Sequence, residues 1–175
     1  TQRPGRMSFF AGQLLALSVA VVAMVVVIFA FGALTSYAIA SSRSETIDWP
    51  SLAEFVRGMS GGWLILMTWC LLGAMLAFFL RGTALSVGLG VVWILGIENL
   101  IVNVAAALLD FADTLQKGLP GVNAGSLVGA LGDGGGGTPG VNTAVDGTQA
   151  TLVLVAYATV FVIMAGVALQ RRDVT

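Results

Sequence analysis

Residues 84–109 read ALSVGLGVVWILGIENLIVNVAAALL and hold a single ionisable side chain, that of Glu98. A helix that crosses the roughly 30 Å hydrocarbon core of a bilayer needs about 20 apolar residues. Three more runs qualify, at residues 9–40, 61–80 and 150–169. In lipid each backbone group must be satisfied within its own segment, so we expect helices and not strands. The sequence predicts an all-α, polytopic membrane protein with four transmembrane helices in a single domain.

The composition excludes several classes of protein. Hydrophobic residues make up 57% of the 175 residues and charged residues 10%, whereas about 25% of a typical soluble domain is charged. The net charge of −1 speaks against a nucleic-acid partner, which requires clustered lysine and arginine. The chain has no histidine and so lacks the commonest metal ligand and general base. We expect a protein that is not an enzyme and that itself binds neither a metal nor a cofactor.

The basic residues predict an orientation, because they mark the cytoplasmic side of membrane proteins. Four alternating spans place both termini and the link at residues 81–83 on one side. That side carries the denser group, Arg3, Arg6, Arg81, Arg171 and Arg172. The other side carries Arg43, Arg57 and Lys117, with most of the acidic residues. We predict that both termini are cytoplasmic, that the protein lies in the cell membrane, and that the short link forms an antiparallel hairpin.

The first external segment covers residues 41–60. Pro50 suits the first turn of a helix, with Asp48 or Ser51 near its start. Apolar residues then recur every three or four positions and form one stripe, Trp49, Leu52, Phe55, Val56 and Met59. This pattern predicts a short amphipathic helix on the outer membrane surface. It is either an interfacial connector or a gate that filters substrate.

The second external segment covers residues 110–149 and is long for a loop. Its first half, LQKGLPGVNAGSLVGAL at residues 115–131, is moderately apolar and is expected to form one or two short helices that dip toward the bilayer. Its second half, GDGGGGTPGVNTAVDG at residues 132–147, is glycine-rich and is expected to be flexible. No Lys-Ser/Thr pair follows the glycines, so they do not form a phosphate loop.

Three polar residues lie within the third predicted span and are its candidate functional residues. Asn99 and Asn103 are four apart and share one face of an α-helix, with Glu98 about 100° round from Asn99. A carboxylate at the centre of a bilayer is costly, so Glu98 should face protein or a water-filled cavity. It could hold a neighbouring helix or subunit, line a translocation pathway, or carry protons.

Several stretches together give the chain a resemblance to a known family. They are TQRPGR (residues 1–6) followed by AGQLLA (11–16), LGAMLAFFLRGTA (72–84), Glu98-Asn99-Leu100, and VALQRRDV (167–174). In this order the chain resembles the permease subunit of bacterial type-2 ABC exporters from the third span onward. Gln13 stands where the family often has lysine, and Leu169 stands near a common aromatic position. The resemblance implies that two spans and a coupling helix precede Thr1.

The resemblance also implies partners and a mechanism. The permease would pair with a second copy or a paralogue, and separate ATPase subunits would bind ATP and drive export. Glu98, Asn99 and Asn103 would line or gate the central cavity. Two other functions stay open from the sequence: a membrane scaffold or assembly subunit that does not transport, and a proton-coupled carrier that uses Glu98.

Overall fold

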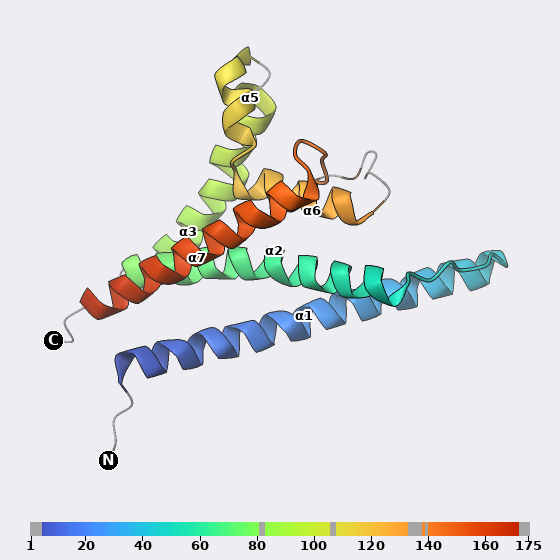
Figure 1. Cartoon of the computed structure of the whole chain (residues 1–175), viewed down its shortest axis with the longest axis horizontal. Coiled ribbons are helices and arrows are strands. Elements are labelled where there is room, and N and C mark those ends of the chain that lie inside the picture. Colours follow the sequence, from blue (N-terminus) through green and yellow to red (C-terminus); the bar gives the residue numbers. More distant parts are fainter. Residues whose placement is uncertain (1–4, 81–82, 106–107, 133–137, 139, 172–175) are drawn as a thin grey trace.

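The computed structural model describes residues 5–80, 83–105, 108–132, 138 and 140–171. All secondary structure in these ranges is helical (Figure 1). The elements in chain order are α1 (Arg6–Arg43), α2 (Leu52–Phe79), α3 (Thr83–Val91), the π-helices η1 (Val92–Glu98) and η2 (Ile101–Ala105), α5 (Asp110–Gln116), α6 (Pro120–Leu131) and α7 (Gly147–Arg171). The all-α prediction is therefore confirmed for the described residues.

Three of these helices are long and apolar enough to cross a membrane: α1 with 38 residues, α2 with 28 and α7 with 25. They contain the predicted spans at residues 9–40, 61–80 and 150–169, apart from Leu80, which caps α2. At 1.5 Å per residue, α1 is about 57 Å long, well beyond the roughly 30 Å of a hydrocarbon core. Most of its apolar side chains are exposed, as expected for a surface that lipid or another subunit covers.

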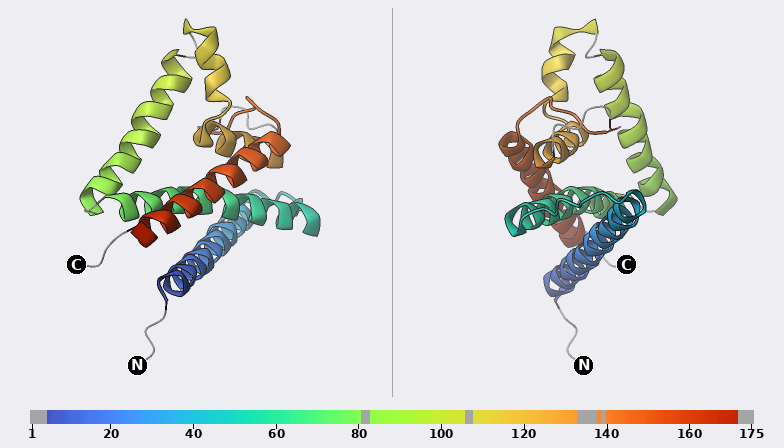
Figure 2. Two further views of the ribbon diagram at one scale, coloured as in Figure 1. Left: turned by 60° about the vertical axis from the view of Figure 1, so that its left-hand side comes forward. Right: turned by 90° about the vertical axis from the view of Figure 1, so that its right-hand side faces the viewer.

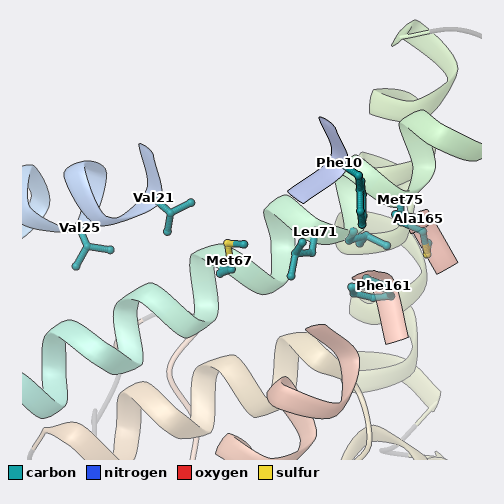
Figure 3. Packing of buried hydrophobic residues seen from close by; sticks show 9 residues of the cluster. Phe10, Val21, Val25, Met67, Leu71, Met75, Phe161 and Ala165 are labelled. Atoms are coloured by element: carbon teal, nitrogen blue, oxygen red, sulfur yellow. The ribbon is translucent and has the colours of Figure 1, made fainter. Parts of the chain in front are cut away.

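The main hydrophobic core lies where α1, α2 and α7 meet (Figure 3). Helix α2 is central, because it packs against both of the other two. Phe10 of α1 makes an edge-to-face contact with Phe78 of α2, with ring centroids 5.8 Å apart. The buried members of the cluster are Phe10, Val21, Val25, Met67, Leu71, Leu72, Met75, Phe161 and Ala165.

The start of α1 and the end of α7 lie at the same end of the molecule (Figures 1 and 2). Gln170 Nε2 donates a hydrogen bond of 3.2 Å to Met7 Sδ, and Phe10 packs beside Gly166. The start of α1 and the end of α7 are therefore in contact, and the prediction that both termini are cytoplasmic stays a prediction. Three arginines used for the predicted orientation lie outside the described residues: Arg3, Arg81 and Arg172.

The expected amphipathic helix within residues 41–60 is not a separate element. Helix α2 begins at Leu52 and continues without a break through the predicted second span. Ser51 is the N-cap and forms a capping box with Glu54, while Pro50 precedes the helix. Gly61 does not end the helix. It lies so close to α6 that a Cβ there would be 2.7 Å from Leu131 Cδ1.

The fourth apolar run, residues 84–109, is helical over most of its length but is not one regular α-helix. Its first part is α3, and the winding then widens to η1 and η2. The stretch Thr83–Glu98 is a shorter apolar helix and does not belong to the three membrane-length helices. It leaves the end of α2 at a steep angle, and α5 returns beside η2 (Figure 2). Most of its large apolar side chains are exposed, among them Leu85, Val87, Leu95 and Leu100.

Of the one or two short helices expected in residues 115–131, α6 (Pro120–Leu131) is present, whereas α5 (Asp110–Gln116) lies almost entirely before this stretch. Helix α6 packs against α7 and α2, and Ala124 and Leu127 form a second buried cluster with Ala150 and Leu154. The segment after the glycine run is fixed to α6 by Asn142, whose Nδ2 donates to Val122 O over 3.2 Å. The glycine run itself, at residues 133–137, lies outside the described residues.

Candidate functional site

Glu98 lies at the end of η1 with only 6% of its surface exposed. Among the described side chains it is the one buried carboxylate. Its Oε1 accepts a hydrogen bond of 2.9 Å from Trp93 Nε1 and a longer one of 3.4 Å from the backbone N–H of Gly121. The carboxylate therefore faces protein, as the sequence predicts, and it joins η1 to the start of α6.

The π-helical winding of η1 explains how Trp93 reaches Glu98. In an α-helix, which turns about 100° per residue, two side chains five positions apart would point about 140° away from each other. A π-helix has hydrogen bonds from i to i+5 and a wider turn, which brings such residues closer to one face. The bond between Trp93 and Glu98 and the π-winding of Val92–Glu98 are thus consistent with each other.

The carboxylate supplies a cap that α6 lacks in its own sequence. The N-cap residue Leu119 has no side-chain acceptor, and Pro120 has no N–H to donate. The next backbone donor is Gly121, and Glu98 accepts from it. A negative group near a helix N-terminus also interacts favourably with the helix dipole. Gly121 is required for this approach, because a Cβ there would collide with Glu98 Oε2.

Two further side chains hold the turn between α5 and α6 in place. Asn123 is fully buried, and its Nδ2 donates to Lys117 O over 2.9 Å and to Leu119 O over 2.7 Å. Tyr157 of α7 donates from its hydroxyl to Gly118 O over 3.1 Å. The start of α6 is therefore fixed from both η1 and α7.

An apolar cavity of about 410 Å³ adjoins this network. It is bounded by α2, α3, η1, the start of α6 and α7, and its lining is almost entirely apolar. The cavity wall includes Trp93, which bonds to Glu98, Tyr157, which bonds to Gly118 O, and Pro120. The remaining wall residues are Leu72, Met75, Leu76, Leu89, Val92, Ile97 and Phe161.

The three sequence candidates do not form one cluster around this cavity. Glu98 is buried beside it, whereas Asn99 is exposed at the junction of η1 and η2. Asn103 lies in η2, and its side chain is outside the described part of the structure. The sequence reasoning missed Trp93 and Tyr157. The sequence did hold a signal for them: both lie within apolar runs, where an indole N–H or a phenol hydroxyl requires a hydrogen-bond partner.

The arrangement suits an anchor between η1 and α6, and Glu98 reaches the cavity wall only through Trp93. Two neutral N–H groups hold the Glu98 carboxylate. Within the described ranges, no group of three or more potential metal-ligating side chains lies together. Comparison with protein-family models, with curated proteins and with solved structures finds no match.

Proposed function

We propose that this chain is part of the permease subunit of an ATP-driven ABC exporter. In this proposal, four helices cross the membrane, both ends lie in the cytoplasm, and the segment containing α5 and α6 faces outward. A second permease copy or a paralogue completes the pathway, and separate ATPase subunits supply the energy. The ordered sequence resemblance and the three helices of membrane length support this function.

The observation that carries the proposal is the apolar cavity beside Glu98. It lies where five helical segments converge, and Trp93 joins its wall to the buried carboxylate. A hollow of this kind between helices is a usual place for a binding site. The exposed apolar face of α3 and η1, with Leu85, Val87 and Leu95, would then be covered by lipid or by the second permease.

Purification of the complete protein in detergent tests the proposal. A nucleotide-binding subunit should co-purify with it, and ATP hydrolysis should depend on that subunit. Reconstituted vesicles should then export substrate only when ATP is supplied on the cytoplasmic face. A stable membrane complex without any ATPase would count against an exporter.

A non-transporting scaffold is the second candidate, and one observation favours it. Glu98 finds both of its bonding partners within its own chain, so its presence is explained by folding alone. In a scaffold, Glu98→Gln would leave assembly intact, and no efflux would be detected with any ATP supply. In an exporter, the same variant would assemble but change the transport rate.

A further inference from the structure

A second hollow lies on another part of the molecule, between α2, α6 and α7. It is a cleft of about 720 Å³ and shares no lining residue with the cavity beside Glu98. Its polar lining consists of Arg57, Ser60, Asp146, Thr148 and Thr151, and its large apolar lining residues are Trp63, Leu64, Leu127, Leu131, Leu152 and Val155.

The polar and apolar residues are separated along the cleft. Helices α2 and α7 pack together and begin at the same end of the molecule (Figure 1). On α2, Arg57 and Ser60 come one to two turns before Leu64. Asp146, directly before α7, and Thr148 in its first turn likewise precede Val155. Along α2 and α7 the cleft is therefore polar near the start of the two helices, which we call its mouth, and apolar further along, while Leu127 and Leu131 of α6 lie beside Gly61.

The mouth presents one group of each charge. Asp146 caps α7, and its Oδ1 accepts from Thr148 N over 2.8 Å and from Gln149 N over 2.9 Å. Both bonds use Oδ1. The other oxygen, Oδ2, takes no part in capping the helix and can accept a hydrogen bond from a cation. Arg57 is exposed on the opposite wall, and its guanidinium suits a phosphate group because it can donate two parallel hydrogen bonds.

The cleft is also continuous with an apolar surface. Leu152 is 65% exposed and Val155 46% exposed, and both line the cleft on one of the three membrane-length helices. An occupant can therefore enter sideways from lipid, with its charged end at the mouth and its apolar part along these side chains.

We propose that this cleft binds one membrane phospholipid whose headgroup carries a phosphate and a primary ammonium. The phosphate lies at Arg57 and the ammonium at Asp146, while an acyl chain packs on Trp63, Leu152 and Val155. A primary ammonium fits better than a quaternary one, because it can donate hydrogen bonds to a carboxylate. The proposal requires that the protein lies in a membrane, but it does not require that it transports anything.

Native mass spectrometry of the purified full chain tests this site. The chain is presented with equal amounts of phosphatidylethanolamine, phosphatidylglycerol and phosphatidylcholine in detergent micelles. We expect one phosphatidylethanolamine to be retained preferentially. Arg57→Gln should weaken the retention of all three lipids about tenfold, since each phosphate loses a charge-assisted partner.

Asp146→Asn is the discriminating variant, since asparagine caps a helix as well as aspartate does. It should lower phosphatidylethanolamine retention about tenfold while leaving phosphatidylglycerol unchanged. Arg43→Gln is the matched control, because Arg43 lies in the last turn of α1 and does not line the cleft. Water-soluble glycerophosphoethanolamine, which has the headgroup and no acyl chains, should not bind.

Four outcomes would overturn the proposal. The wild-type chain could retain the three lipids equally. Arg43→Gln could weaken retention as much as Arg57→Gln, which would indicate attraction to surface charge alone. Asp146→Asn could lower both lipids together with the unfolding temperature, which would indicate loss of the helix. Glycerophosphoethanolamine could bind as strongly as the lipid, which would indicate a headgroup site without an acyl contact.

Discussion

The carboxylate of Glu98 lies against the backbone of Gly121, 23 residues later in the chain, with Oε1 3.4 Å from the amide nitrogen. The contact leaves no space for a side chain at position 121, because a Cβ would collide with Oε2. One acidic residue and one glycine therefore define how α6 meets η1.

Gly121→Ala should destabilise the protein, because the added methyl group forces Glu98 away from α6. Overpacking of this kind costs about 1–3 kcal/mol. The midpoint of thermal unfolding in detergent should fall, and the tryptophan fluorescence should change as Trp93 loses its partner. Gly73→Ala is the control, because a Cβ there has nothing within 4 Å. That variant should be neutral or gain up to about 1 kcal/mol in helix propensity. Equal losses in both variants would contradict the close approach.

Replacement of Glu98 should separate its hydrogen-bonding role from its charge. Glu98→Ala leaves the N–H groups of Trp93 and Gly121 without an acceptor, and each unsatisfied buried group costs about 1–3 kcal/mol. Glu98→Gln retains an acceptor oxygen and should keep most of the stability. Chemical unfolding in detergent measures both. If the two variants lost the same stability, the bonds to Trp93 and Gly121 would not be what holds α6.

Trp93 and Glu98 should be energetically coupled. A double-mutant cycle with Trp93→Phe and Glu98→Ala, each of which removes the bond, should give an interaction energy of about 0.5–3 kcal/mol, the range found for residues in direct contact. Trp49→Phe serves as the control, because Trp49 lies in the connector before α2. Its effect should add to that of Glu98→Ala. An additive result for Trp93 as well would show that the indole bond contributes no stability.

Ser51→Ala should loosen the first turn of α2. The Ser51 hydroxyl accepts from Glu54 N over 3.3 Å, and Glu54 Oε2 accepts from Ser51 N over 2.7 Å. Loss of an N-cap serine costs about 0.5–2 kcal/mol. Hydrogen exchange should therefore speed up at residues 52–55 and not deeper in α2. Ser60→Ala is the control, since Ser60 only bonds back to Arg57 O within the helix. Faster exchange in that variant would rule out a capping effect.

Asn142→Ala should release the segment before α7. The Asn142 side chain donates to Val122 O, and its Oδ1 accepts from Ser126 Oγ and from Ala144 N. The bonds to Val122 and Ser126 tie residues 140–145 to α6, together with those from Asn142 N to Gly125 O and from Val145 N to Ser126 Oγ. Limited proteolysis should cut this segment several-fold faster, because cleavage follows the population of the open form. Thr143→Ala, at an exposed neighbour, should leave the cleavage rate unchanged.

The helices α1, α2 and α7 could be predicted from sequence because long apolar runs require helical backbone in lipid. The continuity of α2 was missed. From sequence, Pro50 and Gly61 look like the two ends of a short helix. In the structure, the capping box at Ser51 starts one helix that includes this stretch and the second predicted span. Residues 115–131 were expected to be helical, but the burial of α6 was missed, because it depends on packing against Ala150 and Leu154 of α7.

The site could be predicted only in part. Glu98 stands out, since a lone carboxylate in an apolar run requires a partner. Its partners do not stand out, because apolar residues lie on every side of residues 84–105. The sequence pattern therefore does not show whether this stretch is an α-helix or a π-helix. In the structure, the π-helical winding of η1 brings the indole N–H of Trp93, five positions earlier, within hydrogen-bond distance of Glu98. Gly121 is a neighbour only because α5 returns beside η2.

Helix α2 contributes lining residues to both hollows. Arg57 and Leu64 line the cleft between α2, α6 and α7, while Leu72 and Met75 line the cavity beside Glu98. Since one helix of 28 residues bears both sets, a tilt or rotation about its axis reshapes the two volumes together. A ligand that moved α2 as a rigid body on entering one hollow would therefore also change the volume of the other.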